Sequence, residues 1–278
     1  MTFTLKPNPV YDFSAWEEIT PAQWQAIADT KPLAVIMRGS YQLIGSRNRY
    51  EDVKAVEYVL KAKSLGLRTG LYHFLTPNGI AEQVALFMSV WNKCGGTDLP
   101  PIVDVEIDLQ ASYSKSPAII GNAVWQSHIK TFIDAVAAAT GKTPIIYTSQ
   151  KYWVFACTKN VLGQFVAPTW TKDYPLWVAQ YPNEPETWTK PTAMPIGWTD
   201  WAMWQYSEKG RQNGFVANDL NTASAAFTEE ITGLPPVVID PPVIVDPPTA
   251  PQIPEYAFIQ FDNGTGGLTP GTYYDLRK

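Results

Sequence analysis

The chain has 278 residues, 45% of them hydrophobic, which is enough for one domain of α/β-barrel size or for two smaller domains with full cores. Its formal net charge of −5 and its lack of a long basic run argue against nucleic acid or an anionic membrane surface as the main partner. The N-terminus has no basic stretch followed by an apolar one, and no run approaches about 18 apolar residues, so we expect neither a secretion signal nor membrane insertion.

The cysteine and tryptophan content narrows further the class of protein to which the chain can belong. Cys94 and Cys157 lie far apart and fit neither a disulfide framework nor a zinc pattern, so we expect ordinary thiols and no metal or cofactor. Seven of the eleven tryptophans fall between Trp153 and Trp204. Such rings can stack on sugars, although most of them are expected to fill a core.

Short β-like segments alternate with helix-like segments from residue 8 to residue 221. The first helix has clear start signals, because Thr20 suits the N-cap, Pro21 the first helical position and Gln23 a capping box. The expected strands are residues 8–14, 33–40, 69–75, 100–107, 144–149, 175–181, 201–207 and 215–221, and helices around residues 20–28, 53–65, 80–91 and 118–140 follow the first four of them.

Apolar spacing in two of these helices predicts which side chains they bury. The expected buried residues are Val53, Val56 and Leu60 in the second helix and Ile120, Val124, Phe132 and Val136 in the fourth, with Gly66 and Gly141 as stops.

Strand–helix alternation of this kind predicts parallel strands joined by crossover helices. The later strands lack long helices between them. We therefore expect an α/β fold, an irregular (β/α) TIM-like barrel rather than eight full units.

The composition changes at residue 234. The text "PPVVID PPVIVD PPTAPQ" is a degenerate six-residue repeat rich in proline, which can form neither a helix nor a central strand. The stretch 255–278 is dominated by turn residues and is too short for a core of its own. We expect a barrel domain over residues 1–233, an extended proline-rich linker over 234–254 and a short C-terminal segment of unknown role over 255–278.

The segment "LPPIVDVEIDL", residues 99–109, places acids at every second position of an otherwise apolar strand. Asp104 and Glu106 share one face, with Cα atoms about 6.5–7 Å apart, and Asp108 continues the pattern. In a parallel barrel the carboxyl ends of the strands form the mouth. Clustered carboxylates repel, so one keeps its proton to higher pH, as glycosidic bond cleavage requires. The alternative is a solvent-facing strand.

Other candidates lie at comparable positions. Asp12 and Asp219 fall at expected strand ends and could converge on the same mouth, or each could be an N-cap or turn residue. Arg38 also ends a strand and could pair with a groove carboxylate or form a structural ion pair. We expect His73 to be a hydrogen-bonding strand-end residue and His128 a solvated or packed helix residue, rather than catalytic bases.

An ordered set of segments resembles the family 25 glycoside hydrolases, the muramidase type of lysozyme. The segments are "YDFSAW", "TGLYHF", "LPPIVDVE", "IIYTS", "LWVAQY" and "WQYSEKG…NDLN", within Pro9 to Phe227. The resemblance implies a compact, irregular α/β-barrel that cleaves the β-1,4 bond between N-acetylmuramic acid and N-acetylglucosamine. Residues 1–233 would then be the catalytic domain.

The resemblance also implies roles for particular residues. It places the proton donor at Glu106, the other site acids at Asp12, Asp104 and Asp219, and groove aromatics at Tyr72, Tyr147 and Trp177. With Arg38, these are the site residues that we expect. The family is described as retaining, with the substrate's own acetamido group as a candidate nucleophile that an aspartate orients. The chain departs from the family in "GSYQLIGSRNRYEDV" after Arg38 and at Asn218, which bears on substrate subsites more than on chemistry.

We expect a peptidoglycan hydrolase. The alternatives are a hydrolase of another N-acetylhexosamine polymer such as chitin, and an inactive wall- or virion-associated binding protein. Without a signal peptide, the enzyme would wait in the host cytoplasm before lysis, as phage lysis enzymes do, or travel with a virion. The C-terminal segment could reach a wall polymer, a virion protein or a second copy of the chain.

Overall fold

The computed structural model describes residues 6–44, 46–107, 122–184, 187–210 and 218–233. The chain divides into two units, Met1–Pro247 and Pro248–Lys278, and the second lies entirely outside the described residues. The expected boundaries after residues 233 and 254 fall at or beyond the last described residue, so they stay predictions.

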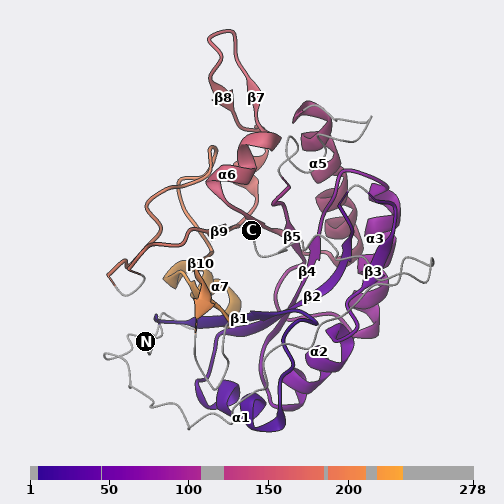
Figure 1. Ribbon diagram of the computed structural model, residues 1–278, viewed down its shortest axis with the longest axis vertical. Helices are drawn as coiled ribbons and strands as arrows, with labels where there is room; N and C mark the ends of the chain where they lie inside the picture. Colours follow the sequence, from indigo (N-terminus) through magenta and orange to yellow (C-terminus); the bar gives the residue numbers. More distant parts are fainter. Residues whose placement is uncertain (1–5, 45, 108–121, 185–186, 211–217, 234–278) are drawn as a thin grey trace, which may run out of the picture. The chain divides into compact units, whose positions relative to one another are not determined.

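Within the described part of the chain, eight strands close into a barrel (Figure 1). In spatial order they are β1 (Pro9–Phe13), β11 (Asn218–Ala223), β10 (Met203–Gly210), β9 (Leu176–Ala179), β6 (Ile145–Thr148), β5 (Ile102–Asp104), β4 (Thr69–Phe74) and β2 (Ala34–Gln42), and pairing of β1 with β2 closes the ring. A ninth strand, β3 (Arg49–Glu51), extends β2 in antiparallel pairing. Neighbouring barrel strands are parallel except around β11, which is antiparallel to both β1 and β10.

Helices cover one side of the barrel and short elements cover the other. Helices α1 (Pro21–Asp29), α2 (Ala55–Ser64), α3 (Ile80–Lys93) and α5 (Asn122–Thr140) form an arc in Figure 1. The later strands are joined by α6 (Gln150–Trp153), the 3₁₀ turns η1 (Val154–Ala156) and η2 (Thr171–Asp173), and the hairpin β7 (Thr158–Lys159) and β8 (Phe165–Val166), and α7 (Ala225–Thr232) follows the last strand. This asymmetry confirms the expected irregular barrel.

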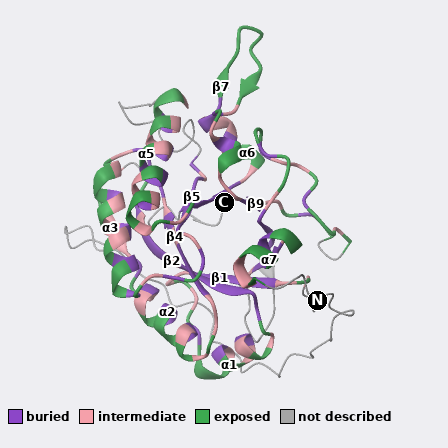
Figure 2. Cartoon of the chain, turned by 180° about the vertical axis from the view of Figure 1, so that it is seen from behind, coloured by how far each residue is buried: buried purple, intermediate pink, exposed green. Residues whose placement is uncertain are grey.

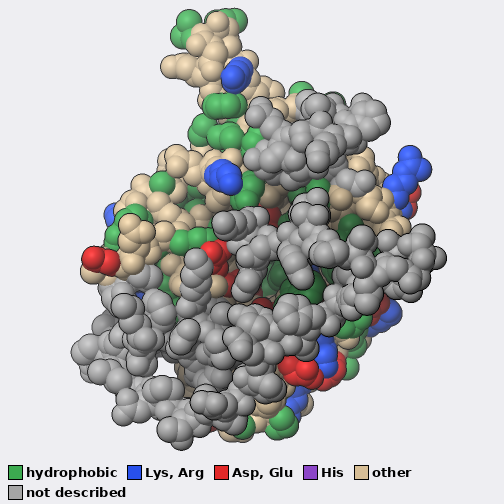
Figure 3. Space-filling view, viewed as in Figure 1, with side chains coloured by type: hydrophobic (Ala, Val, Ile, Leu, Met, Phe, Trp, Pro, Cys, Tyr) green, Lys and Arg blue, Asp and Glu red, His purple; other side chains and the backbone are tan. Residues whose placement is uncertain are grey.

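The β7–β8 hairpin projects away from the barrel as a finger (Figure 1). Its two strands form a separate two-stranded sheet, and Val161 and Leu162 between them are exposed. Figure 3 shows hydrophobic side chains at the tip.

Helix α1 begins as its sequence predicts. The Thr20 side chain accepts a hydrogen bond from the Gln23 backbone N–H, and the Gln23 side chain accepts one from the Thr20 backbone N–H. This reciprocal capping box satisfies two backbone donors that the first turn would leave unpaired.

The predicted buried faces of α2 and α5 need correction. Val53 precedes α2 and is exposed, as is Leu60, and the helix instead buries Ala55, Tyr58, Val59 and Ala62. In α5, Val124 is exposed, whereas Phe132 and Val136 are buried as expected together with Trp125, Ile129 and Ile133. In both helices the buried residues recur at three- and four-residue spacing and combine aromatic with aliphatic side chains. Ile120 lies outside the described residues.

Successive side chains along the strands point alternately into two hydrophobic cores. Tyr11 and Phe13 of β1 point outward and pack in the cluster beneath the helices, whereas Val10 points into the barrel. The inward cluster also contains Ile36, Ile102, Ile145 and Met203, which fill the barrel from below. Figure 2 shows the strands as the buried centre and the helices as half-buried, exposed on their outer faces. The barrel interior therefore has an apolar floor.

Strand β5 is shorter than predicted. It ends at Asp104, and residues 105–107 are not part of the strand. The alternation nevertheless continues, because Val105 donates a backbone hydrogen bond to Tyr147 and both Val105 and Ile107 are buried in the outer core. Glu106 is thereby kept on the inner face. Asp108 lies outside the described residues.

His73 connects three elements from a fully buried position. Its ring nitrogens contact the Ser40 hydroxyl at 2.8 Å and the Gln83 side-chain oxygen at 2.9 Å, and its ring stacks on Phe132 with centroids 5.0 Å apart. The Gln83 side chain in turn donates to the backbone oxygen of Thr76. Burial lowers the pKa of His73 to about 4. The residue is therefore a neutral cross-link, as its strand-end position suggests.

Both cysteines are buried free thiols, and burial raises the pKa of each to about 11. Among the described residues, no helix has both the length and the apolar character needed to cross a membrane.

His73 should make the stability of the protein fall with acid. Between pH 6.5 and 4 the unfolded chain binds a proton at this residue and the folded chain does not, so the free energy of unfolding falls as the pH drops. A His73→Gln variant lacks this contribution, so the stability gap between wild type and variant should narrow by about 3 kcal/mol from pH 7 to pH 4. Denaturant titrations at both pH values measure the gap, and a constant gap would contradict the prediction.

Candidate active site

A cavity of about 90 Å³ opens at the end of the barrel where the parallel strands terminate. Its lining residues are Asp12, Tyr72, Asp104, Glu106, Tyr147, Trp177, Gln205 and Asp219. Seven of the eight residues expected at the site are among them, and Arg38 is not. Figure 3 shows acidic side chains near the centre of this face, among hydrophobic ones.

The four acids reach the cavity in three ways. Asp12 lies near the end of β1 and Asp104 at the end of β5, while Glu106 follows two residues later on the same face. Asp219 lies near the start of β11, and it reaches the mouth because that strand runs antiparallel and pairs Asp219 with Asp12. A mouth built only from carboxyl ends of parallel strands would not include it.

Gln205 on β10 is a site residue that the sequence pattern does not single out. Its side-chain nitrogen donates to Asp12 at 3.3 Å and to Asp219 at 3.1 Å, and its side-chain oxygen accepts from the hydroxyls of Tyr147 at 2.7 Å and Tyr181 at 2.5 Å. The residue is almost fully buried. It links two acids to two tyrosines across the cavity wall.

Asn221 on β11 is a second such residue. Its side-chain nitrogen donates to Asp12 at 2.6 Å, and its oxygen accepts from the indole N–H of Trp177 at 2.9 Å. Both amides have a signal in the sequence. Gln205 lies between Trp204 and Tyr206, and an amide in an apolar strand needs a polar environment on its own face. Asn221 follows Asp219 by two residues and so shares its face.

Burial raises the pKa of Glu106 to about 7, and the charges of Asp12 and Glu208 add to the effect. A carboxyl group with this pKa is protonated in a large fraction of molecules at neutral pH. It can therefore donate a proton to a leaving group, which an ordinary glutamate at that pH cannot.

Asp12 and Asp219 form a pair with unequal acidity. Burial raises the pKa of Asp12 only to about 6, because hydrogen bonds from Asn221, Gln205 and Asp219 favour its ionised form. Burial and the charge of Asp12 raise the pKa of Asp219 well above its ordinary value. Their mutual hydrogen bond thus places the proton on Asp219 and the charge on Asp12.

Asp104 is a buried acid of the site, only 5% exposed. Burial and the neighbouring charge of Glu106 raise its pKa well above the ordinary value, although Arg38 opposes the shift. Its Oδ1 atom is buried and accepts no hydrogen bond from any described residue. A buried acceptor of this kind is costly unless a ligand or water satisfies it.

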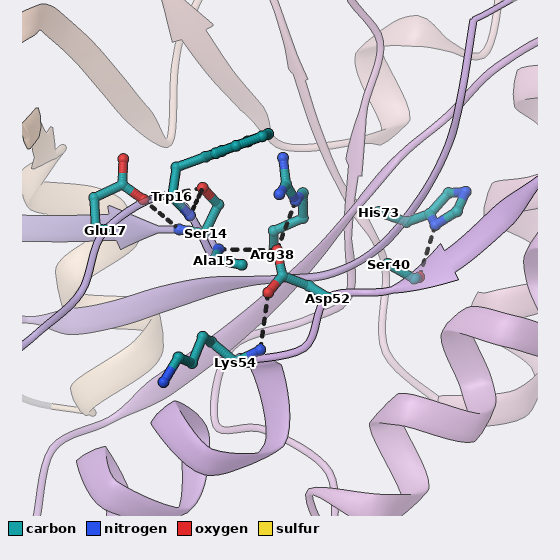
Figure 4. A network of polar contacts seen from close by, with 9 residues as sticks. All are labelled: Ser14, Ala15, Trp16, Glu17, Arg38, Ser40, Asp52, Lys54 and His73. Carbon is teal, nitrogen blue, oxygen red and sulfur yellow. Dashed lines mark hydrogen bonds and ion pairs between the residues drawn. The ribbon is translucent and has the colours of Figure 1, made fainter. Parts of the chain in front are cut away.

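Arg38 forms a structural ion pair rather than a groove contact. Its Nε lies 2.8 Å from Oδ2 of Asp52, which is buried (Figure 4). Its guanidinium lies over the Tyr41 ring, 4.6 Å from the ring centroid. Of the two alternatives for this residue, the ion pair is the one present. Its charge still acts on the cavity, because it lowers the pKa of Tyr72 and of Asp104.

Comparison with known proteins identifies the fold and the chemistry. The model of Glycosyl hydrolases family 25 matches residues 11–215, which is most of the chain. The chain belongs to this family. It is therefore a glycosidase, and its four acids lie where this family 25 barrel opens to solvent.

Individual relatives agree with this assignment. Lysozyme M1 of Streptomyces globisporus is 26% identical over 216 residues, covering 76% of this chain and 67% of the relative. The spore cortex lytic enzyme SleM of Clostridium perfringens shares the fold with a TM-score of 0.61 and 23% identity, over 78% of this chain and 67% of that one. The catalytic domain of the endolysin ply40, from bacteriophage P40 of Listeria monocytogenes, does so with a TM-score of 0.58 and 20% identity, over 84% and 98%.

The Gln205→Leu substitution should shift the pH profile of the family 25 enzyme. Asp12 then loses a donor that lowers its pKa, so the acidic limb of kcat/KM should move up by about half a pH unit or more, with kcat about ten-fold lower. The pH–rate profile measures this shift. The matched control is Gln126→Leu in α5, whose side-chain nitrogen donates to the backbone oxygen of Ala156. An unmoved limb in Gln205→Leu would show that Gln205 does not set the acidity of Asp12.

Proposed function

We propose that this family 25 glycosidase is a muramidase, which hydrolyses the β-1,4 bond between N-acetylmuramic acid and N-acetylglucosamine in bacterial peptidoglycan. The observation that carries the proposal is a proton-holding Glu106 in one small cavity with an Asp12 whose ionised form accepts three hydrogen bonds. The likeness to Lysozyme M1 over 76% of the chain supports the choice of substrate.

Glu106 acts as general acid in this proposal. It donates its proton to the glycosidic oxygen as the C1–O bond breaks, so the leaving sugar departs as an alcohol. The ionised Asp12 stabilises the positive charge that develops on the sugar ring. After the sugar leaves, Glu106 is a carboxylate and takes the proton from the attacking water, which restores the starting state.

The nucleophile in this proposal is the acetamido oxygen of the substrate, which attacks C1 and is later displaced by water. Asp104 is the candidate to orient that group, because its unpaired Oδ1 can accept a hydrogen bond from the acetamido N–H. Asp219, protonated beside Asp12, tunes the charge of the site without transferring a proton to the substrate.

The aromatic residues form the walls of the cavity. Trp177 and Tyr147 are almost fully buried, and their polar atoms bond to Asn221 and Gln205. They therefore shape the cavity and fix the amides more than they offer a flat face to a sugar. Tyr72 lines the wall beside Asp104, and we propose that Arg38 assists substrate binding there through its charge.

Two alternative functions are compatible with the same barrel. A hydrolase of chitin would need the same acids, and reducing-end analysis of products from peptidoglycan and chitin separates the two substrates. A binding protein that has lost activity would have no need of all four acids, and clearing of a wall suspension tests that reading directly.

We also propose a biological setting for the enzyme. A fold shared with the catalytic domain of a phage endolysin fits an enzyme that waits in the host cytoplasm and acts on the wall at lysis. A virion-borne enzyme is the alternative. We propose that residues 255–278, beyond the linker, contact a wall polymer, a virion protein or a second copy of the chain.

Replacing Glu106 with glutamine keeps its shape and removes its proton. We expect kcat to fall by about 10²–10⁴, the usual scale for general acid catalysis, with an unchanged melting temperature. In the wild type, activity should rise through about pH 6 as Asp12 ionises and fall above about pH 7 as Glu106 ionises. Turnover of soluble muropeptide oligomers across pH is the measurement. Near-normal turnover by Glu106→Gln would reject the assignment, and exposed Glu57→Gln in α2 is the control.

Truncation after Gly233 should leave chemistry intact. All four site acids precede that residue, so soluble muropeptide oligomers should be hydrolysed at close to the full-length rate. Activity on intact walls should fall instead, because a tethered wall-binding segment raises the effective concentration of the enzyme at its substrate. Equal loss on both substrates, or a lower melting temperature, would show that the tail packs on the barrel.

A further inference from the structure

The loop between β1 and α1 carries an exposed tryptophan. Trp16 is 72% exposed, whereas each of the other ten tryptophans is buried or half-buried. The loop begins two residues after Asp12, at the end of the barrel where the acids converge. An exposed indole at this place offers a broad flat apolar face on which a sugar ring can stack.

The backbone around Trp16 is fixed rather than loose (Figure 4). Glu17 accepts hydrogen bonds from the backbone N–H and the hydroxyl of Ser14, both at 2.9 Å. The Ala15 N–H donates to the buried carboxylate of Asp52 at 3.0 Å, and the Trp16 N–H donates to the Ser14 hydroxyl at 3.3 Å. A ring on such a loop is pre-organised, so a ligand would bind it without ordering the backbone first.

The residues beside Trp16 are close enough to the cavity for their charges to act on it. Glu17 raises the pKa of both Asp12 and Asp219. On the other side, Arg38 shares Asp52 with the loop and lowers the pKa of Asp104. In Figure 4 the Trp16 and Arg38 side chains project to the same side of the strands. The loop that carries the ring therefore lies beside the mouth.

The cavity itself cannot hold a polymer. Its volume of about 90 Å³ is well below the roughly 300–1,000 Å³ of ordinary ligand pockets, so it accommodates the reacting centre and little else. Its own rings, Trp177 and Tyr147, are 2% and 8% exposed and present no open face. The sugars that flank the scissile bond must rest on the rim.

We propose that Trp16 is the platform of a glycan subsite at this rim, where the apolar face of an N-acetylhexosamine ring stacks on the indole. The subsite rests on the proposed function and adds a contact to it. The C–H groups of a β-linked pyranose face the ring, while its hydroxyl and amide groups point outward to water. Because stacking holds the substrate equally in the ground and transition states, it affects binding more than the chemical step.

The test compares three substitutions on soluble oligomers of the N-acetylglucosamine–N-acetylmuramic acid disaccharide. Trp16→Ala should raise KM about ten-fold with kcat within about two-fold of wild type. Trp16→Phe keeps a flat ring and should recover most of the loss, whereas Trp16→Leu keeps apolar area without a flat face and should not. Phe165→Ala, an exposed aromatic on the β7–β8 hairpin, is the control and should change neither constant.

Wild-type turnover with an unchanged KM in Trp16→Ala would overturn the subsite and leave the proposed function standing. Recovery by Trp16→Leu would overturn stacking in favour of simple apolar contact. A lower melting temperature in Trp16→Ala would show a structural role instead. Absence of wild-type turnover would reject the proposed function and the subsite with it.

Discussion

The burial of four carboxyl groups in one cavity is the constraint on which the rest of the site depends. Four like charges at low dielectric would be very costly, so the group cannot ionise fully at neutral pH. The amide of Asn221 donates to Asp12, and that of Gln205 donates to both Asp12 and Asp219. Together with the hydrogen bond from Asp219, these donors favour the ionised form of Asp12. Protons therefore stay elsewhere in the cluster, and one of them stays on Glu106, where a leaving group needs it.

The barrel supports this arrangement through strand alternation. Outward residues pack under the helices, and inward residues change from an apolar floor to a polar mouth within one strand, as from Val10 to Asp12. The floor excludes water from below and so strengthens electrostatic interactions in the mouth. The antiparallel direction of β11 brings Asp219 opposite Asp12, a pairing that an all-parallel ring could not make.

Much of this was predictable from local pattern, and the failures have physical causes. Period-two alternation placed Asp104 and Glu106 on one face, and the capping signals located α1. The buried face of α2 differs from the predicted one because Tyr58 and the small residues Ala55 and Ala62 share that face with Val59. The partner of Arg38 could not be known, since Asp52 lies in a separate segment and only folding brings the two together. Gln205 was overlooked because an amide carries no charge, although its position in an apolar strand was a usable signal.

The two buried thiols also matter for work with this protein. A thiol with a pKa near 11 is almost never a thiolate at neutral pH, and burial blocks access to reagents as well. The cysteines of the native chain should therefore not react with maleimide dyes. A single cysteine introduced at the exposed Val161 on the hairpin finger would be the one reactive handle, so a fluorophore could be attached far from the acids without first removing Cys94 or Cys157.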